Sequence, residues 1–147
     1  MEIPIPHSPL KATNSYLIEG PERNLLVDTG QNCREALAAL RSGLKDLDVD
    51  MEKTDIFLTH MHADHWGLAP WVRSESSVLY ASKIDADIIN IQRTAADPLN
   101  FLFVAACRNG FSPEEAKMAL GGHPGNDLGA QEPLQFNFIQ EGFCLQV

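Results

Sequence analysis

Basic side chains, cysteines and long apolar runs are all scarce in this chain of 147 residues, and each shortage excludes a class of protein. The longest apolar run covers residues 101–107, which is far too short to cross a bilayer. The first residues carry neither the basic nor the apolar segment of a signal peptide. The three cysteines, at Cys33, Cys107 and Cys144, are odd in number and widely spaced. We therefore expect buried free thiols in a cytoplasmic protein that does not enter membranes.

The charge balance is acidic, because eleven Lys and Arg face twenty Asp and Glu, for a formal net charge of −9. A field of this sign repels phosphate groups, so we expect no nucleic-acid partner and no anionic lipid surface. Hydrophobic residues make up 44% of the chain and charged residues 21%, a balance typical of a globular protein with a real core. Without internal repeats or low-complexity tracts, residues 1–147 are expected to form a single domain.

Strand and helix patterns alternate through the first half of the chain. Short apolar runs predict strands, and four leucines at helical spacing after a cap at Asn32 predict a helix. This alternation indicates an α/β (α+β) fold class with its core in residues 14–81. The predicted elements are strands at 14–19 and 24–28, a helix at 33–47, a strand at 55–58, a short helix at 66–73 and a strand at 77–81.

The second half of the chain has a different pattern. Residues 82–122 carry three consecutive helix signals, the clearest being the cap and first-turn proline at Ser112 and Pro113. We therefore expect a helical insertion over this range. Residues 134–147 read as a β-hairpin with strands at 135–139 and 143–147. The last strand pattern ends without a polar tail or a closing helix, so we interpret the chain as a truncated domain, with a natural terminus as the alternative.

The clearest functional signal is the run from His60 to His65, His-Met-His-Ala-Asp-His, which we call the metal loop. Three of the five histidines in the chain fall within these six positions. In an extended segment side chains alternate, so His60 and His62 share one side roughly 6.5 Å apart, and both can reach one ion. Asp64 and His65 follow as the chain turns and can reach a second ion. The simpler alternative is a solvated histidine-rich loop.

The segment Thr59–His65 matches the His-x-His-x-Asp-His motif of the metallo-β-lactamase superfamily. Residues 25–30, Leu-Leu-Val-Asp-Thr-Gly, are also similar to that family's second strand and the turn after it. The resemblance implies the N-terminal half of an αββα sandwich. It implies that His60 and His62 bind a first metal and that Asp64 and His65 bind a second. It further gives Asp64 a catalytic, proton-handling role and has Asp28 orient the loop; an ordinary strand-end turn is the alternative for Asp28.

The match to that family stops where its later ligands should come, a further His for each metal and a bridging Asp. After His65 the only histidine is His123, which we interpret as a surface residue, with a ligand role as the alternative. One half of the sandwich would also leave a sheet face uncovered. We therefore predict a homo-oligomer or a strand-exchanged dimer.

The resemblance to glyoxalase-II-like and thioesterase-like members predicts a hydrolase with two zinc ions. A metal-bound hydroxide would attack the carbonyl of a small-molecule thioester, ester, lactone or amide. Iron or manganese fits the same ligand types, so an iron-dependent oxidoreductase of the same fold is one alternative. A non-catalytic half-domain, completed by oligomerisation or by a partner, is another.

Overall fold

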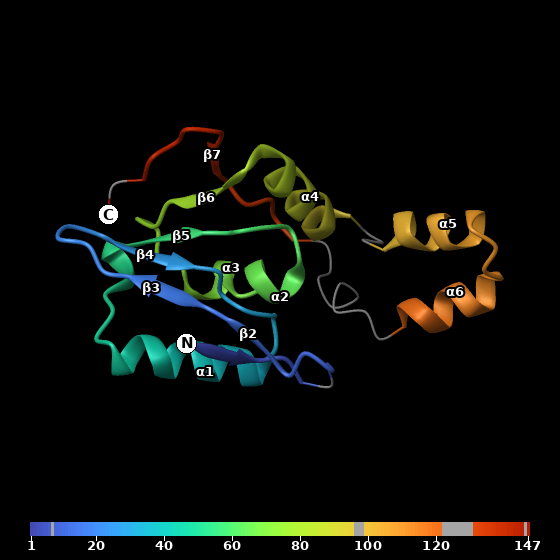
Figure 1. Ribbon diagram of the computed structural model, residues 1–147, viewed down its shortest axis with the longest axis horizontal. Helices are drawn as coiled ribbons and strands as arrows, with labels where there is room; N and C mark the ends of the chain where they lie inside the picture. Colours follow the sequence, from blue (N-terminus) through green and yellow to red (C-terminus); the bar gives the residue numbers. More distant parts are fainter. Residues whose placement is uncertain (7, 96–98, 122–130, 146) are drawn as a thin grey trace. The chain divides into compact units, whose positions relative to one another are not determined.

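The computed structural model describes residues 1–6, 8–95, 99–121, 131–145 and 147 (Figure 1). The chain divides into two compact units. The first contains residues 1–86 and 135–147, and the second contains residues 87–134.

A five-stranded sheet forms the centre of the first unit, in the order β3-β4-β5-β6-β7. The first pair, β3 and β4, is antiparallel, whereas β4, β5, β6 and β7 run parallel to one another. A separate two-stranded ladder joins β1 and β2. The strands are β1 (Glu2–Pro4), β2 (Ala12–Asn14), β3 (Tyr16–Ile18), β4 (Asn24–Val27), β5 (Thr54–Phe57), β6 (Leu79–Ser82) and β7 (Asn137–Ile139).

Helices connect the parallel strands. The helix α1 (Arg34–Asp46) and a 3₁₀ turn, η1 (Met51–Lys53), link β4 to β5. Two short helices, α2 (Ala63–Trp66) and α3 (Ala69–Val72), link β5 to β6 (Figure 1). Because parallel crossovers are right-handed and these strands neighbour each other in chain order, α1, α2 and α3 are all placed on one face of the sheet.

The core of this unit lies on that covered face. The strand register aligns Leu26 with Ile56 and Ile56 with Leu79, and all three side chains are buried. Leu40 of α1 and Trp66 of α2 are also fully buried. Of the four leucines at helical spacing, Leu40 and Leu44 are buried in the apolar stripe of α1, whereas Leu47 is the C-cap and is 49% exposed.

The opposite face of the sheet carries partly exposed apolar side chains beside the ion pair of Asp55 with Arg23. The register aligns Tyr16 with Val27, Val27 with Phe57, and Phe57 with Tyr80, which places these side chains on the face that alternates with the core. Tyr16 is 59% exposed and Ile18, two residues along the same strand, is 48% exposed. We give the name open face to Tyr16, Ile18, Val27, Phe57 and Tyr80.

The segment after β5 differs from its predicted form. A helix was expected from 66 to 73, but α2 begins at Ala63, inside the metal loop, and ends at Trp66. The chain then turns at Gly67 before α3. A Cβ atom at Gly67 would lie 2.6 Å from the Ala63 carbonyl oxygen and 2.6 Å from the Asn32 nitrogen, so this approach of two backbones requires glycine.

The predicted terminal hairpin is also not formed as expected. Only β7 is a strand, and it pairs with β6 in parallel rather than with residues 143–147. A turn containing Gly142, with φ at +82°, follows β7. The Phe143 ring then packs beside the Tyr80 ring, with the two ring centroids 6.1 Å apart. Among residues 143–145 and 147 no strand is formed.

The second unit is mainly helical in its described residues, with residues 131–134 outside any helix or strand. It contains most of α4 (Lys83–Thr94), together with α5 (Asn100–Arg108) and α6 (Pro113–Leu120). Ser112 and Glu115 form a reciprocal capping box at the start of α6, as the sequence predicts. The helices predicted between 82 and 122 are therefore present where they can be described. Within the described ranges, no helix has the length and hydropathy that a membrane span requires.

Candidate metal centre

The metal loop lies at the carboxyl-terminal edge of the parallel strands. It follows β5 directly, and Asp28 follows the neighbouring strand β4. Leu58 extends the pairing with β6, because its N–H donates to the Tyr80 carbonyl. This edge is where open α/β sheets gather functional side chains.

Two histidines of the loop converge on each other. Nε2 of His60 lies 3.0 Å from Nδ1 of His62, and the two rings are nearly perpendicular, with their centroids 4.7 Å apart. Two nitrogens bound to one tetrahedral zinc at about 2.0–2.1 Å would lie roughly 3.3 Å apart. The pair therefore has close to the separation that a shared ion requires.

The second pair, Asp64 and His65, lies in the first turn of α2. Nε2 of His65 is 3.6 Å from Oδ2 of Asp64, and its ring centroid is 4.1 Å from that of His60. The four predicted ligands thus form two adjacent pairs. No group of three or more His, Cys, Asp or Glu within the described ranges is arranged to hold one ion. His123 lies outside the described residues.

Asp28 connects to both ends of the loop segment. Its Oδ1 accepts a hydrogen bond from the Thr59 backbone N–H, and its Oδ2 accepts from the Thr59 hydroxyl and from Nδ1–H of His65, at 2.9, 2.7 and 2.7 Å. Asp28 is 4% exposed and has a φ of +57°. Its bond to Nδ1 leaves Nε2 of His65 facing Asp64, which is how an outer carboxylate fixes the tautomer of a ligating histidine.

The pKa values of His60 and His65 are shifted in opposite directions. Burial, followed by the charges of His65 and His62, lowers the pKa of His60 below its ordinary 6.5. The hydrogen bond to Asp28 raises the pKa of His65, although burial opposes it. A histidine that binds a metal must do so as the neutral imidazole. The His60 environment therefore favours the ligating form, whereas His65 must lose a proton that Asp28 stabilises.

Several residues that hold the loop were not predicted from the sequence. The Met61 N–H donates to Oδ1 of Asp85 at 3.1 Å, and the Met61 carbonyl accepts from the Trp66 indole at 3.0 Å. Thr29 binds the His65 carbonyl through its backbone N–H and its hydroxyl. The only sequence signal for Asp85 is its place three residues after Ser82, which indicates a helix cap and gives no sign of a contact with the loop.

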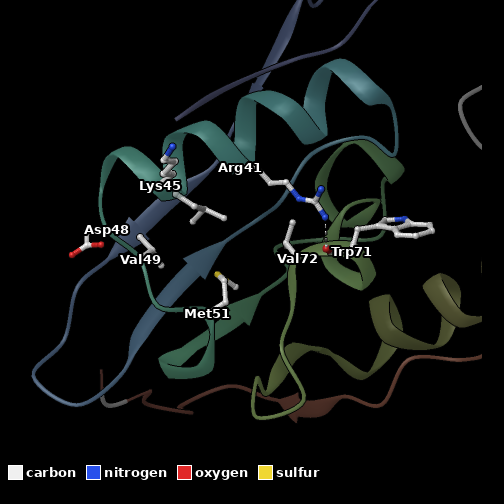
Figure 2. Close-up of a pocket in the computed structure, with 8 residues that line it drawn as sticks. Arg41, Lys45, Asp48, Val49, Met51, Trp71 and Val72 are labelled. Carbon is white, nitrogen blue, oxygen red and sulfur yellow. Dashed lines mark hydrogen bonds between the residues drawn. The ribbon is translucent and has the colours of Figure 1, made fainter.

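A separate pocket opens between α1 and α3 (Figure 2). Figure 2 shows Arg41 reaching toward the Trp71 carbonyl, at 3.5 Å. No residue of the metal loop lines this pocket, so we do not associate it with the candidate metal centre. Its lining residues are Arg41, Leu44, Lys45, Asp48, Val49, Met51, Trp71 and Val72.

Comparison with known protein sequences gives a consistent family. A profile described as the metallo-beta-lactamase superfamily matches residues 9–85. Lactamase-like protein aptB of Emericella nidulans is 33% identical over 81 residues, which cover 52% of this chain and 26% of that protein. An atrochrysone carboxyl ACP thioesterase of the same organism is 39% identical over 61 residues, 41% of this chain and 19% of that protein.

Solved structures give the same fold over nearly the whole chain. A metallo-beta-lactamase family protein from Thermus thermophilus superposes with a TM-score of 0.71 at 26% identity, covering 99% of this chain and 46% of that one. A beta-lactamase domain protein from Burkholderia ambifaria has a TM-score of 0.68 at 20% identity, covering 100% and 43%. The chain thus spans less than half the length of these relatives. With the profile matching more than half of its residues, the chain belongs to the metallo-β-lactamase superfamily.

Proposed function

We propose that this chain supplies the first ligands of a dinuclear zinc hydrolase that cleaves small-molecule thioesters, esters, lactones or amides. The observation that carries the proposal is the convergence of His60 and His62 beside the pair Asp64 and His65, at the strand edge of a superfamily fold. A relative named as a thioesterase supports the thioester among these substrates.

The residues present fit part of such a centre. His60 and His62 would hold one ion, and Asp64 with Nε2 of His65 would hold the other. Bound zinc would bring the pKa of a water molecule toward about 7 and stabilise negative charge on the carbonyl oxygen. Asp64 would exchange a proton with the reacting groups, and the hydrogen bond between Asp28 and Nδ1 of His65 would keep Nε2 of His65 directed at Asp64.

Each ion would have two ligands from the loop, whereas a catalytic zinc normally has three protein ligands. For this reason we expect the chain to bind zinc weakly and to turn over substrate slowly. The second candidate function is a non-catalytic half-domain completed by a second copy or a partner. It is favoured by the small number of ligands, because the described residues hold no three-ligand cluster.

The test is a zinc titration of the metal-free chain by calorimetry, together with hydrolysis assays on a thioester, an ester and a lactone. His62→Ala should weaken zinc binding at least tenfold, because one of two ligands is lost. His123→Ala tests the alternative ligand role of His123: an unchanged zinc affinity would exclude that role, and a loss like that of His62→Ala would support it. Equal zinc affinity of wild type and His62→Ala would refute the proposal. Binding without any turnover would favour the half-domain.

The identity of the metal has its own measurement. His and Asp suit zinc, iron and manganese alike. We expect zinc in protein purified without added metal, by elemental analysis. Iron at one or two ions per chain would instead favour the oxidoreductase alternative.

A further inference from the structure

We propose that Asp85 is a positioning residue for the metal loop, which it holds at the peptide group that joins His60 to Met61. The inference deepens the proposed function, because it assumes that the loop binds metal. Asp85 lies in the first turn of α4, directly after β6, and it belongs to the same compact unit as the loop.

The backbone of Met61 is held by two hydrogen bonds, one on the peptide group before this residue and one on the peptide group after it. Its N–H donates to Oδ1 of Asp85 at 3.1 Å, and its carbonyl accepts from the indole of Trp66 at 3.0 Å. Trp66 is fully buried, so the second anchor belongs to the core. A hydrogen bond to an ionised carboxylate is stronger than one between neutral groups. Asp85 is therefore an effective acceptor for the Met61 N–H.

The backbone at Met61 sets the directions of both imidazoles. His60 and His62 flank Met61, and the chain bends at His60 and Met61. A rotation of the His60–Met61 peptide group would therefore move the two rings relative to each other and separate the two nitrogens that now lie 3.0 Å apart. Asp28 accepts hydrogen bonds from Thr59, just before the loop, and from His65 at its far end. The two backbone groups of Met61 are bound by Asp85 and Trp66 instead.

The two oxygens of Asp85 have different partners, so its two roles can be separated. Oδ2 accepts from the Ser82 hydroxyl at 2.5 Å, and the Ser82 oxygen accepts from the Asp85 N–H at 3.1 Å. This exchange caps α4. Oδ1 is used for Met61. If Asp85 only capped the helix, losing the Ser82 side of the cap should have the same effect on the loop as losing Asp85.

The experiment compares Asp85→Ala, Asp85→Asn and Ser82→Ala in the full chain, with zinc alone as the probe. We expect Asp85→Ala to lower zinc affinity roughly 10- to 100-fold, the usual effect of losing a residue that orients ligands. Asp85→Asn keeps an acceptor for Met61 and should recover most of that loss. Ser82→Ala should lower the melting temperature through the cap but reduce zinc affinity less than Asp85→Ala.

A second readout uses the metal-free protein. Amide hydrogen exchange at Met61, followed by NMR, should be faster in Asp85→Ala and close to wild type in Ser82→Ala. Equal zinc affinity and equal Met61 exchange in wild type and Asp85→Ala would overturn the inference, as would equal effects of Asp85→Ala and Ser82→Ala. If wild type itself failed to bind zinc while Met61 exchange responded to Asp85→Ala, the proposed function would be wrong and the positioning contact would stand.

Discussion

Oδ2 of Asp28 accepts a hydrogen bond from Nδ1 of His65 at 2.7 Å, which joins the residue after β4 to the end of the metal loop. Asp28 also receives both hydrogen bonds from Thr59. A single buried carboxylate therefore holds the beginning and the end of the segment that carries the candidate ligands.

We predict that Asp28→Ala destabilises the fold by about 2–3 kcal/mol, because it removes the buried acceptor of three partly buried hydrogen bonds from Thr59 and His65. The φ of +57° at this position adds strain for alanine. Asp28→Asn keeps one acceptor oxygen and tolerates the left-handed conformation, so its loss should be smaller. Urea denaturation measures both variants. Equal stability of Asp28→Ala and wild type would show that the network is not buried as described.

A second prediction concerns pH in the metal-free chain. NMR titration should place the pKa of His65 above 6.5, since the Asp28 hydrogen bond raises it, and the pKa of His60 below 6.5, since burial lowers it. The His65 contribution to stability should therefore be fully present below pH 6.5 and disappear as the pH rises through its folded-state pKa. In Asp28→Asn the His65 pKa should fall. A His65 pKa at or below that of His60 would contradict the hydrogen bond.

Gly67→Ala should destabilise the protein by about 1–3 kcal/mol, because the added methyl group would overlap two backbone atoms that cannot move independently. Gly121→Ala is the control. Gly121 has right-handed helical dihedrals, with φ at −60° and ψ at −28°, and its added Cβ would lie no closer than 3.3 Å to the atoms around it. In thermal denaturation, the melting temperature of Gly67→Ala should be clearly lower than that of Gly121→Ala. Similar melting temperatures would mean that the turn after α2 can relax.

The open face gives the test of self-association. We predict that wild type forms a dimer at micromolar concentration, because an apolar sheet face must be buried against another layer. Ile18→Lys should shift the population toward monomer, whereas Leu10→Lys, a substitution of an exposed leucine outside the five-stranded sheet, should leave it unchanged. Light scattering measures both. A wild-type monomer would contradict the prediction.

The sequence predicted those parts of the structure that depend on local pattern. The leucine spacing gave α1, the apolar runs gave β4, β5 and β6, and the histidine cluster located the loop at the end of β5. The capping signal at Ser112 also corresponds to a real helix start. In each of these segments the signal lies within the element itself. The predicted cap of α1 at Asn32 was wrong, because the N-cap is Cys33 and makes no side-chain cap hydrogen bond.

The predictions that differ from the structure concern residues far apart in the chain. The partner of β7 is β6, more than fifty residues earlier, and hydrophobic alternation alone does not reveal which strand a short run will pair with. The same holds for Asp85, whose contact with Met61 spans 24 residues. The roles of Asp28 and of the four loop residues as parts of a metal centre stay predictions until metal binding is measured.

The metal loop and the two carboxylates that hold it follow three neighbouring parallel strands. Asp28 comes after β4, the histidines come after β5, and Asp85 comes after β6. The pairing of those strands therefore shapes the loop before any ion arrives. An incoming cation would meet donors that already face one another, and little ordering entropy would oppose its capture. Uptake should then be fast, with affinity differences between variants appearing mainly in how quickly the ion leaves.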